Sequence, residues 1–159
     1  MNIKNKGSFV LPIIIILLNI IELFLLIYIN NVIYSGVIRY SICFGNYFVL
    51  IFFSVSKINK KSKENNIAYL IITLLLIIII PVLLWYNKPA YTYNQAIEKI
   101  KSQKSIIVIP TNAKSLRMIN SPNIFINKIY LIRVKEAGEL KTYGFNPING
   151  YYYLSQNIN

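Results

Sequence analysis

The stretch KINKKSK, residues 57–63, separates two long apolar segments and carries four lysines. Positively charged residues that flank membrane-spanning helices stay preferentially on the cytoplasmic side. This loop therefore indicates the direction in which the chain crosses a bilayer. We expect a membrane protein in which residues 57–63 are cytoplasmic.

The composition agrees with this expectation. Of the 159 residues, 55% are hydrophobic, and the mean hydropathy of +0.51 is high for a soluble globular domain. The chain has 17 Lys and Arg residues against 5 Asp and Glu residues, which gives a net charge of +12. Such an excess favours a polyanionic partner, whether nucleic acid, anionic lipid or an anionic polymer.

The residue types that most enzymes need are missing. The chain has no histidine and no aspartate, and its single cysteine, Cys43, lies in an apolar stretch. The commonest general base, the usual zinc ligand and a Ser-His-Asp triad are therefore excluded. Ser54 and Lys57 have the Ser-x-x-Lys spacing of some acyl-transfer enzymes, but serine and lysine are common at the ends of membrane helices. We expect no enzymatic activity, no cofactor and no metal.

Three segments have the roughly 20 apolar residues that a helix needs to cross a bilayer. They cover residues 8–29, 37–55 and 67–86, and residues 1–86 are predicted to form a three-helix transmembrane domain. The first segment resembles a signal peptide, but no small-residue cleavage site follows it. It is therefore expected to be an uncleaved anchor.

A cytoplasmic lysine loop determines the placement of every other segment. The N-terminus is then inside, the connector 30–36 is outside, and the chain after Asn87 is extracytoplasmic. The connector contains no Lys or Arg, which agrees with the positive-inside rule. The residues expected to anchor the helices at the two interfaces are Lys57, Lys60, Lys61, Lys63, Trp85 and Tyr86.

Glu22 and Arg39 are the only charged residues within the first two predicted spans. They are equally distant in sequence from the pair Asn30-Asn31, so a helical hairpin that turns there would bring them to one depth. The sequence predicts an intramembrane ion pair between them. The alternative is an ion or proton site, because ionisable groups inside a membrane are candidates for function.

Residues 87–159 are predicted to form a separate extracytoplasmic α+β domain. Thr92 and Gln95 match a capping box, which predicts a helix from there to about Gln103. Residues 105–110 and 124–134 are expected to be strands, with a loop over 111–123. Two glycine-containing turns, 136–139 and 146–150, then predict an antiparallel meander of three or four strands.

The helical sequence TYNQAIEKI, residues 92–100, and the later GFNPINGY, residues 144–151, resemble the PepSY domain. That family opens with a helix that has an Ala-Ile core pair and closes with a strand, an Asp-x-x-Thr-Gly turn and a last strand. Here Asn146 and Asn149 replace the more usual Asp and Thr. The resemblance implies a small extracytoplasmic module that binds or restrains other proteins and has no catalytic residues. The alternative is another wall-side α+β domain with a similar turn.

The predicted outer domain is basic, with ten Lys and Arg residues against three glutamates. Its placement outside the cell argues against nucleic acid and favours anionic lipid or a wall polymer as the polyanion. The tyrosines of residues 151–153 are expected to alternate between the core and an exposed side. The predicted interaction surface consists of Tyr151, Tyr152, Tyr153, Arg133, Lys135 and Lys141.

These observations predict a multi-pass cell-membrane protein that acts by binding. The function we expect is that of an accessory or regulatory protein whose outer module engages an extracytoplasmic protein. The alternative is an immunity protein against a membrane-active peptide, since small basic polytopic proteins suit that task. The abundance of Ile, Asn, Lys and Tyr is typical of an A+T-rich genome and suggests a Gram-positive bacterium.

Overall fold

The computed structural model describes residues 7–60, 66–117 and 123–155. The chain forms two compact units, and each unit is built from two parts of the sequence. The first takes Met1–Ile27 and Tyr40–Tyr86, and the second takes Tyr28–Arg39 and Asn87–Asn159. The division predicted at residue 86 differs in one respect, because it assigns residues 28–39 to the helical part.

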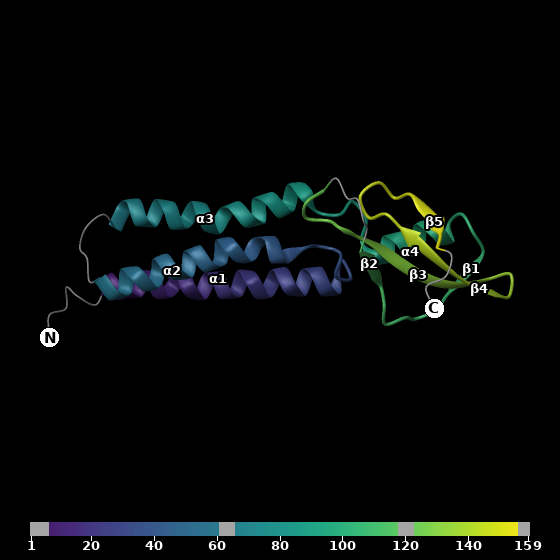
Figure 1. Ribbon diagram of the computed structural model, residues 1–159, viewed down its shortest axis with the longest axis horizontal. Coiled ribbons are helices and arrows are strands. Elements are labelled where there is room, and N and C mark those ends of the chain that lie inside the picture. The colour runs from purple at the N-terminus through teal and green to yellow at the C-terminus, as the bar shows by residue number, and fades with distance from the viewer. Residues whose placement is uncertain (1–6, 61–65, 118–122, 156–159) are drawn as a thin grey trace. The chain divides into compact units, whose positions relative to one another are not determined.

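The first unit consists of helices. They are α1 (Gly7–Val32, which continues into the second unit), the 3-10 helix η2 (Tyr40–Cys43), α2 (Phe44–Lys60) and α3 (Asn66–Asn87). Figure 1 shows α1, α2 and α3 running alongside one another. Three stretches are long and apolar enough to cross a membrane, namely Val10–Val32, Tyr40–Ile58 and Ile67–Asn87. The second begins three residues later than predicted, so Arg39 precedes it.

Regularly spaced side chains hold the first unit together. On α1 the buried residues include Ile15, Asn19 and Leu26, and along η2 and α2 they are Cys43, Tyr47, Leu50 and Ser54. Intervals of three and four residues place such side chains on one face of a helix. Two polar contacts join α2 to α3: Asn46 Nδ2 donates to the Leu76 carbonyl over 2.9 Å, and the hydroxyls of Ser54 and Tyr69 lie 3.1 Å apart.

The second unit packs one helix, α4 (Tyr93–Lys101), on an antiparallel sheet. The strands are β1 (Ile106–Val108), β2 (Ser115–Arg117), β3 (Lys128–Glu136), β4 (Glu139–Phe145) and β5 (Tyr152–Leu154). Their order is β1-β3-β4-β5, and β2 pairs with β3 beside β1. The predicted helix start is confirmed, because the capping box of Thr92 and Gln95 is present.

The hairpin between β3 and β4 is also confirmed. Glu136 pairs with Glu139, and the two residues between them, Ala137 and Gly138, have φ angles of 49° and 89°. Positive φ at both central residues is the conformation that a two-residue hairpin turn requires. The turn at residues 146–150 closes differently, since the side chains of Asn146 and Asn149 accept backbone hydrogen bonds from Ile148 and Tyr151.

Two strand predictions are corrected. The predicted loop over 111–123 contains β2, which pairs with Lys128–Tyr130 because β1 occupies only the other end of β3. The long strand begins at Lys128 rather than at Ile124. The preceding residues turn instead, because the Asn123 side chain accepts the Phe125 N–H over 2.8 Å.

The core of the second unit lies between α4 and the sheet. Its buried residues are Val37, Tyr93, Ala96, Ile100, Tyr130, Ile132, Val134, Tyr143 and Phe145. Val37 comes from the segment that connects α1 to η2 and is completely buried. Two further contacts bind this segment to the unit: the backbone of Ile38 bridges that of Ile126, and the Lys128 side-chain ammonium donates to the Gly36 carbonyl over 2.8 Å. The connector is therefore part of the second unit.

Candidate functional site

The strand register separates the sheet into two faces. On β3, Tyr130, Ile132 and Val134 point to the side that α4 covers. The alternate residues point to the other side, where Ile129 and Leu131 are buried. We call the exposed part of that side, to which each strand contributes, the open face. Its members are Ile107, Leu116, Arg133, Lys135, Leu140 and Tyr153.

The open face combines exposed apolar side chains with positive charge. Ile107 and Leu140 are each 69% exposed, and Tyr153 is 44% exposed. Arg133 and Lys135 are exposed between them on β3. The described strand residues of this face include no acid. A surface with these properties can bind a partner that is both apolar and acidic, because each group would find its complement there.

Tyr153 extends this surface along the last strand. Its ring covers Gly144, where an added Cβ would lie only 2.9 Å from the ring atom Cζ. Tyr151 is 67% exposed, and its ring centroid lies 6.4 Å from that of Tyr153. The glycine thus lets an aromatic ring lie on the sheet, and two neighbouring tyrosines are left accessible.

Tyr152 faces the other way. Its ring stacks on Phe145 with the centroids 6.5 Å apart, and its hydroxyl donates to the Gln103 side chain over 2.6 Å. The three tyrosines therefore alternate between core and exposed positions, as the sequence predicts. The predicted interaction surface does not form one patch, because Tyr152 and Lys141 lie on the side of α4 while Arg133, Lys135 and Tyr153 lie on the open face.

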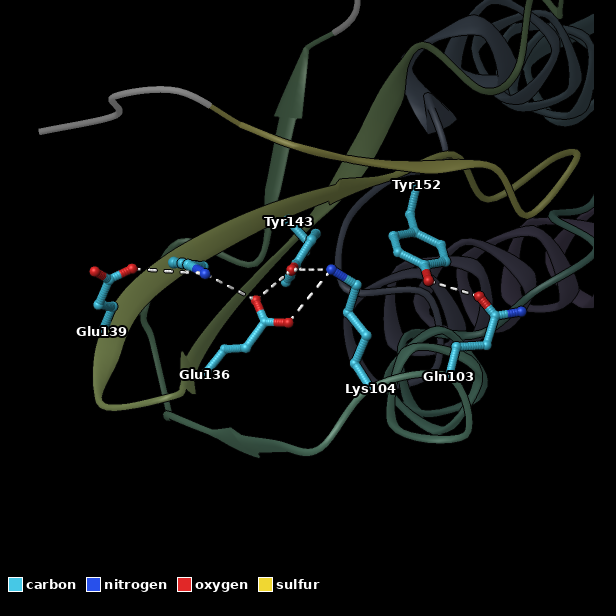
Figure 2. A network of polar contacts seen from close by, with 7 residues as sticks. Gln103, Lys104, Glu136, Glu139, Tyr143 and Tyr152 are labelled. Carbon is cyan, nitrogen blue, oxygen red and sulfur yellow. Dashed lines mark hydrogen bonds and ion pairs between the residues drawn. The ribbon is translucent and has the colours of Figure 1, made fainter.

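Figure 2 shows a network of charges at the end of the sheet where β3 and β4 turn. The buried Tyr143 hydroxyl accepts from Lys104 Nζ and donates to Glu136 Oε2, each over 2.7 Å. Glu136 lies 3.4 Å from Lys104 and 3.2 Å from Lys141, which also approaches Glu139 to 3.6 Å. Every charge in the network therefore faces an opposite charge.

This network perturbs the ionisation of its members. The pKa of Glu136 is lowered, first by the hydrogen bond from Tyr143 and then by Lys141 and Lys104. The pKa of Lys104 is raised, chiefly by its bond to Tyr143, and that of Lys141 is raised by Glu136. The ionised forms are thus stabilised. We assign the network a structural role, in which it ties the end of α4 to the β3–β4 hairpin.

The helical unit contains a second group of polar side chains. Both carboxylate oxygens of Glu22, the Tyr47 hydroxyl and Asn19 Oδ1 are buried and have no hydrogen-bond partner among the described residues. Glu22 belongs to the first unit and Arg39 to the second, so the ion pair between them stays a prediction. Within its own unit, Glu22 interacts electrostatically with Tyr47 and Cys43.

The residues predicted as membrane anchors are placed as follows. Lys57 Nζ lies over the Tyr69 ring, 5.7 Å from its centroid, and Trp85 and Tyr86 are 69% and 83% exposed. Lys61 and Lys63 lie outside the described residues, as does the side chain of Lys60. Ser54 is completely buried with its hydroxyl beside Tyr69, which gives the Ser54–Lys57 spacing a structural explanation.

Sequence reasoning did not identify the apolar part of the open face. The sequence predicts Ile107 and Leu140 only as strand residues and Leu116 only as part of a loop. Period-two alternation places all three opposite the core once the strands and their register are known. Among the described residues no group of three His, Cys, Asp or Glu side chains could hold a metal ion. Comparisons of the chain with protein-family models, curated proteins and solved structures gave no match.

Proposed function

We propose that this chain is a membrane-anchored accessory or regulatory protein that binds an extracytoplasmic protein through the open face. The observation that carries the proposal is the combination, on one side of a sheet, of exposed Ile107 and Leu140 with the cations Arg133 and Lys135. The partner is a protein that presents acidic and apolar side chains together. A wall polymer lacks the apolar part, and nucleic acid is not expected outside the cell.

Two observations support a PepSY-like module. A capped helix precedes an antiparallel sheet with a tight hairpin and a final short strand, which is the order that the resemblance implies. In the last turn Asn146 and Asn149 accept hydrogen bonds with their side-chain oxygens. Asp and Thr could supply an oxygen at the same positions, so the two replacements preserve the chemistry of the turn.

The orientation in the membrane forms part of the proposal. Three helical stretches long enough to span, together with the lysine-rich residues 57–63, favour a cytoplasmic N-terminus and an extracytoplasmic second unit. Protease added to intact protoplasts should remove the chain after Asn87 and spare the lysine loop. Cleavage of the loop alone would reverse the orientation and exclude an outer partner.

Site-specific photo-crosslinking tests the partner surface. A photoreactive residue at Leu140 should give one crosslinked protein in native membranes, whereas the same residue at exposed Glu98 on α4 should not. Double reversal of charge, R133E with K135E, should abolish that crosslink because both cations of the open face are lost. K101E, which reverses an exposed charge on α4, is the matched control and should leave it intact.

The outcomes separate the two functions considered from the sequence. A crosslinked peptidase, wall enzyme or membrane subunit that disappears with R133E and K135E supports the accessory role. A small secreted peptide in its place would support the immunity function. A crosslink that survives the double reversal would exclude the open face as the binding surface.

A further inference from the structure

The first unit buries more hydrogen-bond acceptors than it can satisfy. Glu22 contributes two carboxylate oxygens, Asn19 its Oδ1 and Tyr47 its hydroxyl, and no partner among the described residues meets these atoms with good hydrogen-bond geometry, although the Tyr47 hydroxyl lies close enough to Glu22 to interact with it. Tyr47 is 3% exposed and Asn19 is 1% exposed. Buried polar groups are almost always paired, so a group of orphaned oxygens in one place indicates that a ligand belongs there.

The helix pattern explains why these side chains meet. The inward residues of α1 fall at positions 15, 19, 22 and 26, and those of η2 and α2 fall at 43, 47, 50 and 54. Both sets have intervals of four, three and four residues. When two helices run antiparallel, as α1 and α2 do in Figure 1, this match places Glu22 level with Tyr47. Their mutual electrostatic influence agrees with that pairing.

The orientation of Asn19 follows from its own hydrogen bond. Its Nδ2 donates to the Ile15 carbonyl over 3.0 Å, which leaves Oδ1 as an acceptor. Asn19 lies three residues before Glu22, so the two side chains share a face of α1. In the ionised state of Glu22, the Tyr47 hydroxyl would be the only donor for the other three oxygens of this group. A proton bound to Glu22 adds a second donor, the carboxyl O–H, to that of Tyr47.

The charge of an ionised Glu22 would also have no counterion among the described residues that face it in its unit. From η2 and α2 it faces the neutral side chains of Cys43 and Tyr47, and α3 has no acidic or basic residue between Asn66 and Asn87. Arg39 belongs to the second unit. An unpaired charge in an apolar interior is costly, and ionisable groups in such places bind protons or ions.

We propose that Glu22 is a proton-binding group inside the helical unit and that Tyr47 and Asn19 line its site. A proton neutralises the carboxylate without further ligands. A metal cation would need more oxygens than this group offers, and the neighbouring inward residues Leu26 and Leu50 supply none. The site depends on a bilayer around the helices but not on binding by the open face, so either proposal can fail alone.

Dicyclohexylcarbodiimide provides the test, because this apolar reagent adds to protonated carboxyl groups in membranes. Full-length protein in liposomes should be labelled at Glu22 at neutral pH, with labelling that decreases as the pH is raised. E22Q should lose the label completely. Exposed Glu98 is the internal control and should react only with a water-soluble carbodiimide. Mass spectrometry of the peptides locates each adduct.

A pair of tyrosine variants tests the lining of the site. Tyr47→Phe should change the pH at which labelling is half-maximal, whereas Tyr69→Phe on α3 should leave it unchanged. Size-exclusion chromatography checks that both variants remain folded. An unchanged midpoint in folded Tyr47→Phe would remove Tyr47 from the site.

Two outcomes would overturn the proposal. Wild-type protein that resists the reagent, while Arg39→Gln is labelled, would show that Glu22 is held ionised by Arg39. Protection by sodium but not by potassium, at constant pH and ionic strength, would identify a sodium site instead.

Discussion

The backbone N–H of Arg39 donates a hydrogen bond to the carbonyl of Phe125 over 2.7 Å. The Asn30 side chain makes two hydrogen bonds to the backbone of the preceding residue, Ile38. Its Oδ1 accepts from the Ile38 N–H and its Nδ2 donates to the Ile38 carbonyl, each over 2.9 Å. The connector thus behaves like an added edge of the second unit. Its buried residue Val37 gives this attachment an apolar component.

Replacing Val37 by alanine should destabilise the second unit by about 2 kcal/mol, because the side chain fills a position in a closed core. The loss of stability is measured by heating the full-length protein in detergent and monitoring the unfolding of the second unit by its sensitivity to protease. Val32→Ala is the matched control, since Val32 is 61% exposed. Equal effects of the two substitutions would contradict a core role for Val37.

Gly150→Ala should destabilise the second unit more than Gly138→Ala. Both glycines have positive φ, 72° and 89°, so each substitution costs about 1 kcal/mol in backbone strain. A Cβ at Gly150 would also lie 2.5 Å from Lys99 Nζ and 2.7 Å from the Tyr91 ring, whereas a Cβ at Gly138 would have no described atom within 4 Å apart from its chain neighbours. Melting temperatures of the two variants give the comparison, and a larger loss for Gly138→Ala would contradict it.

The stability of the second unit should decrease at acidic pH because of Glu136. A pKa lowered by folding contributes stability that is present above the ordinary value of 4.5 and is lost as the pH falls through the folded value. E136Q should therefore flatten the acid side of a plot of melting temperature against pH. E139Q is the control. It should leave the acid side of the plot unchanged, because the Glu139 side chain is mostly exposed.

Alkaline pH tests the other half of the same network. The pKa values of Lys104 and Lys141 are raised, so their contribution is complete below the ordinary value of 10.5 and is lost as the pH rises through the folded values. Between the acid and alkaline limits the melting temperature should be nearly constant. A steep slope near neutrality would indicate a different titrating group.

Thr92→Ala should cost about 1 kcal/mol, because the Gln95 N–H at the start of α4 loses its acceptor. Circular dichroism and the melting temperature report the change. Asn94→Ala on the exposed side of the same turn should have little effect or stabilise slightly, since alanine favours helix. A loss as large as that of Thr92→Ala would indicate that the cap is not the cause.

Local chemistry made part of the fold predictable. The capping box at Thr92 and the two-residue turn at Ala137-Gly138 depend on residues that are neighbours in sequence, and both are present as predicted. β2 could not be predicted in the same way. Its three residues form a strand only because β3 has an unoccupied length of edge beyond β1, which is a property of the sheet.

The candidate sites were likewise predictable only where they depend on local sequence. Alternation placed Tyr151, Tyr152 and Tyr153 correctly. The predicted grouping of Lys141 with Arg133 was wrong, because the strand register pairs Lys141 with Val134 and so places it on the side of α4. For Glu22, the predicted hairpin turned at Asn30-Asn31. In the structure α1 continues to Val32, and positive φ at Ser35 and Gly36 follows. The later turn makes residue 47 level with Glu22.

The way the connector enters the second unit has a consequence for how this protein can change. A domain that is one continuous piece of chain can be exchanged between genes as a cassette. Here a fragment that began at Asn87 would lack Val37 and the backbone partners of Phe125 and Ile126. The second unit therefore requires the connector between α1 and η2, and chimeras should be joined within α1 rather than after α3.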